Sequence, residues 1–137
     1  MPIIKLSNGL RVCNFSSPHD FSFEDSSILK ACSLDHAEKY KVNFNEVKTK
    51  QLINNIEIEN IELSFSLSDV LLKEVKEIIK TWKLKNEYDL IIIPLTMLNA
   101  IKENKELKNI DLKELPFRVI RMRSRTEKKV KVDQFCL

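Results

Sequence analysis

The residues near the amino terminus that could do chemistry include two cysteines and two histidines. Cys13, His19, Cys32 and His36 follow the pattern C-x5-H-x12-C-x3-H. Zinc accepts two cysteines and two histidines in a tetrahedral site, but familiar zinc modules begin with a closely spaced cysteine pair, which is missing here. A zinc site is therefore one alternative. The other is that both cysteines fill core positions and both histidines are ordinary polar residues.

A nucleophile could come from the loop that follows Cys13. This loop contains Ser16, Ser17, His19 and Asp20, but the members of a catalytic triad normally come from distant segments, and the chain has no Gly-x-Ser-x-Gly motif. These side chains are expected to hydrogen-bond within their own turn. The chain also has a single glycine, which excludes phosphate-binding glycine loops and dinucleotide fingerprints. The sequence thus predicts no cofactor and no catalytic residue.

Positive charge is concentrated near the carboxyl terminus, in a basic segment that we define as residues 118–131. It has seven basic residues and one acid, a local charge of +6, whereas the whole chain has a net charge of +3. Basic residues alternate with apolar ones, which places them on one face of a β-strand. We therefore predict a basic ribbon that binds phosphate or an acidic partner. The predicted binding residues are Arg118, Arg121, Arg123, Arg125, Lys128, Lys129 and Lys131.

A hairpin of residues 119–125 and 129–135 would form this ribbon, and the length of its loop decides which faces match. A two-residue turn at Glu127-Lys128 would set Arg125 opposite Val130. Every basic residue would then share a face with apolar ones, because a slip of one residue moves every side chain to the other face.

A loop of three or five residues would instead keep the basic residues together. It sets Arg123 opposite Lys131 and Arg121 opposite Asp133. We expect this second register, although like charges directly opposite each other destabilise a sheet by a few tenths of a kcal/mol. An alternative without a binding function is that the lysines and arginines protect an exposed edge from the addition of further strands.

The composition is that of a soluble globular protein. A chain of 137 residues corresponds to one domain, residues 1–137, and its 43% hydrophobic and 31% charged residues allow a core. The longest apolar run, Leu90–Ile93, is too short to span a bilayer. The amino terminus does not resemble a signal peptide. Three cysteines without such a signal predict reduced thiols and a cytoplasmic location.

The amino-terminal residues predict an antiparallel hairpin with strands at about 3–6 and 10–14. Its three-residue loop, Ser7-Asn8-Gly9, would pair Leu6 with Leu10 and Ile4 with Val12. The chain's single glycine lies at the third loop position, where a left-handed residue is required.

Three further predictions cover the segment up to residue 43. Residues 21–23 alternate as a short strand, residues 24–26 form a turn, and residues 28–32 suit another strand. Residues 35–43 are polar and short, so they predict no more than one or two helical turns.

Between residues 47 and 65, apolar and polar residues again alternate, but the apolar residues change from even to odd positions in the middle. A two-residue turn at residues 59–60 would reconcile the two halves, because it pairs Ile58 with Ile61 and Ile56 with Leu63 on one face. We therefore expect a hairpin that turns at residues 59–60.

Ser66–Lys85 is predicted to be the longest helix, capped by Ser66 or Ser68. The only tryptophan, Trp82, lies on its apolar stripe and is expected in the core. The stripe consists of Leu71, Val75, Ile78, Ile79 and Trp82.

The second half of the chain predicts alternating strands and helices. Leu90–Ile93 reads as a strand buried on both faces, residues 96–104 form a shorter helix, and Pro116 precedes the basic ribbon. Helical crossovers imply parallel pairing. The predicted fold is therefore α+β with a mixed sheet: antiparallel hairpins first, then β-α-β-α-β, then the basic hairpin.

Two stretches resemble small uncharacterised proteins encoded by bacteriophages and other DNA viruses. They are KLSNGLRVCNFSSPHDFSFEDSSILKACS, residues 5–33, and RVIRMRSRTEKKVKVDQFCL, residues 118–137. The resemblance implies a virus-encoded accessory or structural role and assigns no site residue. One departure from the pattern is Ser26, which stands where a glycine is expected after Glu24-Asp25.

Two hypotheses about function follow. The first is a non-enzymatic, virus-like accessory or assembly protein in the cytoplasm, which docks an acidic protein or nucleic acid, and no membrane, through the basic ribbon. The second is a small enzyme with a site at the carboxyl end of strand 90–93, where open α/β sheets bind ligands. Thr96, Asn99 and the loop of residues 16–20 would be the candidate residues.

Overall fold

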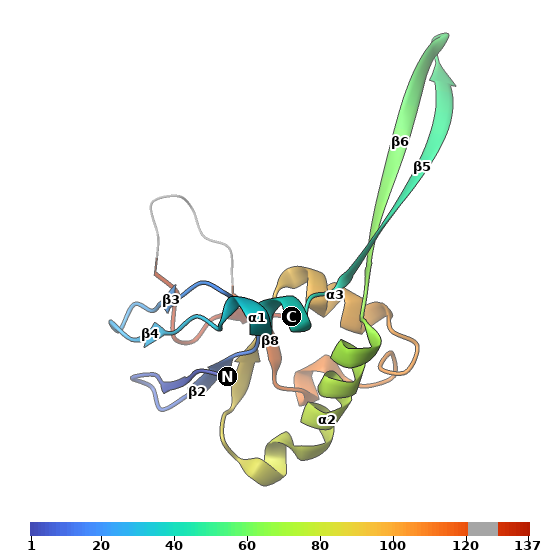
Figure 1. The fold of residues 1–137 in the computed structure, drawn as a ribbon. Coiled ribbons are helices and arrows are strands. Elements are labelled where there is room, and N and C mark those ends of the chain that lie inside the picture. The colour runs from blue at the N-terminus through green and yellow to red at the C-terminus, as the bar shows by residue number, and fades with distance from the viewer. Residues whose placement is uncertain (121–128) are drawn as a thin grey trace.

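A five-stranded mixed sheet forms the centre of the computed structural model, which describes residues 1–120 and 129–137 (Figure 1). The strand order is β1-β2-β7-β8-β9. The outer pairs are antiparallel, whereas β7 pairs in parallel with both β2 and β8. The predicted α+β class with a mixed sheet is confirmed. The strands are β1 (Ile3–Lys5), β2 (Arg11–Asn14), β7 (Leu90–Ile92), β8 (Phe117–Ile120) and β9 (Phe135–Cys136).

The first hairpin has the predicted register. Ile4 lies opposite Val12, and the backbone N–H of Leu6 donates to the carbonyl of Leu10 at 2.8 Å. Gly9 has a φ of +89°, in the left-handed region that only glycine adopts without cost. The local turn chemistry therefore sets this pairing, as the sequence indicated.

β7 is buried on both faces, as predicted for a strand with parallel neighbours. Ile91 and Ile93 pack in one apolar cluster, and Ile92 packs in another on the opposite face of the sheet. The first cluster is covered by α2 (Asp69–Lys85) and α3 (Leu95–Glu103). None of the helices in the described part of the chain is long and apolar enough to cross a membrane.

α2 begins and ends where local chemistry dictates. The Oγ of Ser68 accepts the backbone N–H of Leu71 at 3.2 Å, and the helix ends at Asn86 with a φ of +49°. Trp82 packs against the core as predicted, but it is not fully buried. Trp82 is half-buried at the margin of the first cluster, and the Nζ of Lys83 lies 5.7 Å from its ring centroid.

Smaller elements cover the second cluster and connect the sheet. β3 (Phe21–Ser22) and β4 (Ile28–Leu29) form a short hairpin whose Phe23 and Leu29 are fully buried. The other two elements are α1 (Leu34–Lys39) and a 3-10 turn, η1 (Leu112–Glu114). They complete the body, by which we mean the described residues outside β5 and β6.

The region after residue 42 differs from its prediction. β5 (Asn43–Ile53) and β6 (Ile56–Ser66) form one long hairpin that projects from the body, which we call the arm (Figure 1). It turns at Asn54-Asn55, with φ of +51° and +63°, and not at residues 59–60. Two consecutive left-handed residues suit the two-residue hairpin turn, and asparagine tolerates that region better than most residues.

The carboxyl-terminal strands also differ from their prediction. β8 and β9 are antiparallel, but Ile120 lies opposite Phe135, whereas the expected register would place it opposite Gln134. Ile120 and Phe135 both pack on the second cluster, so burial selects this register. Val130, expected in the same hairpin, forms a parallel bridge with Phe23 instead.

The turn between β3 and β4 generates a prediction about acid stability. The Asp25 carboxylate accepts the backbone N–H groups of Ser7 at 2.7 Å and Ser27 at 2.9 Å, and these bonds lower its pKa to about 2. The pKa of an aspartate in the unfolded chain is about 3.9. Its contribution to the free energy of unfolding is therefore present above about pH 4 and is lost as the pH falls towards 2.

Asp25→Asn should consequently lose less unfolding free energy than the wild type when the pH falls through this range. Urea denaturation at a series of pH values measures the difference, with the exposed Glu62→Gln as control. Parallel curves for the wild type and Asp25→Asn would contradict the assignment.

Candidate functional site

The first predicted binding residue, Arg118, has a structural role. Its guanidinium donates to the backbone carbonyls of Leu115 at 2.6 Å, Phe117 at 2.8 Å, Leu112 at 3.3 Å and Lys113 at 3.4 Å. Partial burial lowers the pKa of Arg118. These bonds tie the guanidinium to the backbone around η1, where the Leu112 carbonyl also accepts the N–H of Leu115 at 3.1 Å. Arg118 is thus not a free cation for a partner.

Two other predicted cations lie where the carboxyl-terminal segment crosses the amino-terminal hairpins. The backbone N–H of Val130 donates to Ser22 at 2.8 Å, and its carbonyl accepts from Glu24 at 2.9 Å. Lys129 is exposed and Lys131 is half-buried on either side of this attachment. Four of the predicted binding residues lie outside the described residues: Arg121, Arg123, Arg125 and Lys128. The structure therefore describes only the two ends of the basic segment.

Three of the four candidate zinc ligands have other surroundings or partners. Cys13 is fully buried, and burial raises its pKa to about 12. The thiol of Cys32 donates to the Asn14 carbonyl at 3.4 Å. The Nε2 of His36 lies 2.7 Å from the carbonyl of Phe15, so this nitrogen carries the proton. No group of three or more His, Cys, Asp or Glu side chains gathers into a metal site among the described residues.

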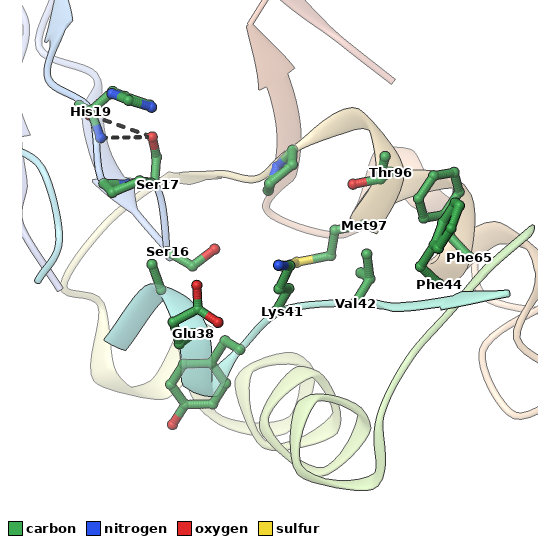
Figure 2. A pocket seen from close by; sticks show the side chains of 14 residues that line it. Ser16, Ser17, His19, Glu38, Lys41, Val42, Phe44, Phe65, Thr96 and Met97 are labelled. Atoms are coloured by element: carbon green, nitrogen blue, oxygen red, sulfur yellow. Dashed lines mark hydrogen bonds between the residues drawn. The ribbon is translucent and has the colours of Figure 1, made fainter. Parts of the chain in front are cut away.

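A pocket of about 690 Å³ lies at the root of the arm, beside the carboxyl end of β7 (Figure 2). This is where the enzyme hypothesis placed a site. Thr96 and the loop with Ser16, Ser17 and His19 do line it, but Asn99 does not. Most of the lining is apolar or aromatic, including Tyr40, Val42, Phe44, Phe65, Pro94 and Met97.

The polar groups around the pocket do not converge on a common point. The Ser17 hydroxyl accepts the backbone N–H of His19 at 3.2 Å, and the His19 ring extends away from the pocket (Figure 2). Asp20 accepts the backbone N–H of Ala31 at 2.7 Å. The side chains of this loop therefore bond within its own turn and the neighbouring strand, as the sequence indicated. The pocket offers apolar contact surface and no nucleophile–base pair.

The fully buried Asn14 organises this loop. Its side-chain amide donates to the carbonyls of Ser17 at 3.0 Å and Lys30 at 2.9 Å, and its Oδ1 accepts the N–H of Ser17 at 2.9 Å. Sequence analysis did not single out this residue. A polar side chain at the end of a strand, before a serine-rich loop, was the available signal.

The largest exposed feature is the arm. Its strands have eleven residues each, about 35 Å of extended chain. Every strand residue is exposed except Phe65, which is half-buried. Within the part of the chain that the structure describes, β5 and β6 pair only with each other. β6 also lies beside α3, and at the root Phe44 and Phe65 share a pocket lining with Thr96 and Met97 of α3. Away from these contacts, one backbone edge of each strand has no partner strand in the described chain.

The arm exposes apolar side chains from its root to its tip. Leu52 is 70% exposed and Ile56 is 64% exposed, on either side of the Asn54-Asn55 turn. At the root, the rings of Phe44 and Phe65 pack with centroids 5.4 Å apart and line the pocket. The exposed apolar residues are Phe44, Val47, Leu52, Ile53, Ile56, Ile58, Ile61 and Leu63. The register places them on both faces of the ribbon: Leu52 and Ile61 on one, Ile53 and Ile58 on the other.

The two strands of the arm differ in charge. β5 has two lysines and one glutamate, whereas β6 has three glutamates and no basic residue. Within the arm, Lys50 and Glu57 form an ion pair at 3.3 Å, and Lys48 lies 4.0 Å from Glu59. All four side chains are largely exposed, so these pairs contribute little to stability. The arm is acidic overall, which does not favour contact with nucleic acid.

Sequence analysis found the strands of the arm but not the arm itself. The missed signal was Asn54-Asn55, two residues that tolerate a left-handed backbone between two alternating runs. The apolar residues change from even to odd positions between Ile58 and Ile61, and this change predicted a turn there. In a ribbon that buries neither face, apolar residues can lie on either face, so no turn is needed.

Comparison with known proteins gives no relative. No family model, no curated protein and no solved structure matches the chain. The site therefore has to be argued from the described residues alone.

Arg118 generates a prediction that separates structure from binding. Arg118→Met keeps the aliphatic stem but removes all donors, so four carbonyls lose a partner and the free energy of unfolding should fall by about 1–2 kcal/mol. Chemical denaturation measures this loss. Lys129→Met, which alters an exposed cation in the same segment, should leave the stability unchanged. Equal effects of the two substitutions would contradict the structural role of Arg118.

Proposed function

We propose that this protein is a non-enzymatic assembly or accessory protein that binds a protein surface through its arm. The observation that supports this proposal is the arm's exposure. It has two strands of eleven residues, paired only with each other in the described chain, with apolar side chains in water along both. A two-stranded hairpin is marginally stable by itself, and a third strand or a packed face is what usually stabilises one.

The arm adds no strand residue to the two apolar clusters, although β6 lies beside α3. Only Val42 and Leu67, the residues that flank the strands, pack against the first cluster, and the strands themselves are absent from both clusters. A long insertion that does not stabilise its own fold is better explained by contact with another chain, because an open edge and exposed apolar residues promote aggregation unless they are covered.

The basic segment supplies the second contact in this proposal. With Arg118 occupied by backbone carbonyls, the cations for an acidic protein or nucleic acid are Arg121, Arg123, Arg125, Lys128, Lys129 and Lys131. Arginine suits carboxylates and phosphates because its planar group can bind two oxygens at once. The acidic arm and the basic segment would thus bind different partners or different parts of one partner.

The enzyme hypothesis has weaker support. The pocket has the expected place, but the Ser17 hydroxyl bonds to the backbone of its own loop and the His19 ring extends away from the pocket (Figure 2). Asp20 does not line the pocket, and its carboxylate accepts the backbone N–H of Ala31. A hydrolytic site requires a nucleophile and a base within hydrogen-bond distance. An apolar lining is more useful for holding an apolar side chain of a partner.

Protection of the arm from proteolysis tests the proposal. Lys48 and Lys50 are exposed trypsin sites on β5. In an extract of the cells that produce the protein, we expect cleavage there to be slower than in the purified, dilute chain, because a partner covers the arm. The exposed Lys105 of the body serves as the internal reference site. Equal cleavage of the arm in extract and in dilute solution would contradict the proposal.

A salt titration tests the basic segment. If four to six of its cations contact phosphates of duplex DNA, the log–log slope of affinity against salt should be roughly −4 to −5. Lys129→Met should reduce the magnitude of this slope by about 1, whereas Arg118→Met should leave it unchanged. No binding, or a flat slope, would exclude nucleic acid as the acidic partner and leave an acidic protein.

A further inference from the structure

We infer that the partner of the arm is the arm of a second copy of this chain, with β6 of one copy paired edge to edge with β5 of the next. The inference deepens the proposed function, because it names the protein surface that covers the arm. It follows from the backbone pattern of the arm, from the distribution of charge between its strands, and from the number of edges that have to be covered.

The backbone pattern determines which groups are available for pairing. Ile53 and Ile56 flank the two-residue turn, so they form a hydrogen-bonded pair, and such pairs alternate with non-hydrogen-bonded pairs along the arm. Lys50–Glu59 and Lys48–Ile61 are pairs of the second kind. Their N–H and C=O groups point outwards, and each open edge offers a regular row of donors and acceptors.

The charges decide which edge fits which. Pairing β6 with β6 would bring together the glutamates at 57, 59 and 62, and like charges facing each other destabilise a sheet. Pairing β5 with β5 would leave the β6 edge of both copies open. β6 against β5 sets a strand with three glutamates beside one with two lysines, and the same contact repeats at every interface.

The direction of the strands also allows β6 of one copy to pair with β5 of the next. Two arms that lie side by side and point the same way bring β6 and the neighbouring β5 together as antiparallel strands. Without stagger, Glu59 of one copy lies opposite Lys50 of the next, and Phe65 lies opposite Phe44. The cross-strand pairs that exist within one arm are then repeated between arms, and Lys50 has Glu59 directly opposite on both sides.

This contact is of the head-to-tail kind, in which different surfaces of the two copies meet. Such contacts produce a ring when the rotation between copies closes and a filament when it does not. A closed ring of arms would have no open edge, which is the most complete way of covering a β-edge. The described structure supplies both edges of every interface, so no other chain is required.

Charge reversal on one strand at a time tests the pairing. Lys48→Glu/Lys50→Glu makes both edges acidic, and Glu57→Lys/Glu59→Lys makes both edges basic. In sedimentation equilibrium, each variant alone should need at least about a tenfold higher concentration than the wild type for half-assembly. An equimolar mixture of the two should assemble again, because every edge then meets one of opposite charge.

The matched control reverses all four charges in one chain. Lys48→Glu/Lys50→Glu/Glu57→Lys/Glu59→Lys keeps opposite charges within each arm and between arms, so it should assemble like the wild type. This control shows that the pattern of opposite charges matters and not the particular residues. The equimolar mixture separates the loss of contact between copies from damage to the hairpin, since each chain in it still has like charges inside its own arm.

A backbone variant tests hydrogen bonding at the edge independently of charge. The N–H of Ile61 points outwards, so Ile61→Pro removes a donor for the neighbour and none from the arm's own ladder. Ile61→Pro should assemble more weakly than Ile61→Thr, which retains the N–H. Equal assembly of these two variants would overturn edge-to-edge pairing.

The wild type decides between self-association and another partner. If the purified chain remains monomeric at every concentration, the inference is overturned. Slow cleavage of the arm in a cell extract would then still support the proposed function, with a different chain as the partner. Assembly of the two double variants at wild-type concentrations would also overturn the inference, because complementary charge would then play no part.

Discussion

The parallel pairing of β7 with both β2 and β8 is the constraint on which the rest of the structure depends. Parallel strands cannot be joined by a tight turn, so each connection has to leave the sheet and return to it. The connection from β7 to β8 does so with α3. The connection from β2 to β7 is much longer and contains β3, β4, α1, the arm and α2. Of these elements, α2 covers one face of the sheet and the β3–β4 hairpin covers the other, whereas the strands of the arm belong to neither cluster.

This arrangement explains how a small body can support so long an arm. Ile91 and Ile93 on one face and Ile92 on the other connect the two clusters through a single buried strand, and neither cluster includes a residue of β5 or β6. The arm starts directly after α1 and ends directly before α2, so its root is held by Val42 and Leu67 while its strands extend into solvent (Figure 1). In the proposed function, a partner surface adds to the free energy that orders these strands.

Sequence analysis succeeded where local chemistry decides the structure. Gly9 determined the first hairpin, Ser68 and the apolar stripe determined α2, and the run at 90–93 gave β7. It failed where strand pairing depends on contacts with residues far away in the sequence, or where a strand has no such contacts. The turn at residues 59–60 was predicted by assuming that β6 buries one face, but the arm buries neither. The register of β8 and β9 depends on Phe135 packing beside Ile120 in the second cluster, which no local pattern shows. For the candidate site, the sequence indicated a position near the carboxyl end of β7 for Thr96 and for the loop whose residues 16–19 line the pocket. Alternation did not show that Arg118 donates to nearby backbone carbonyls.

Hydrogen exchange of the arm amides, measured residue by residue, tests most directly whether arms pair through their edges. In a lone arm, the N–H groups of Lys48, Lys50 and Glu59 point outwards and should exchange about as fast as in an unfolded chain. In the concentrated wild-type protein the account predicts that these amides become as protected as the inward-pointing N–H groups of Thr49 and Ile58. Rapid exchange of the outward amides in protein that is fully assembled would contradict the account, because the copies would then be joined through some other surface.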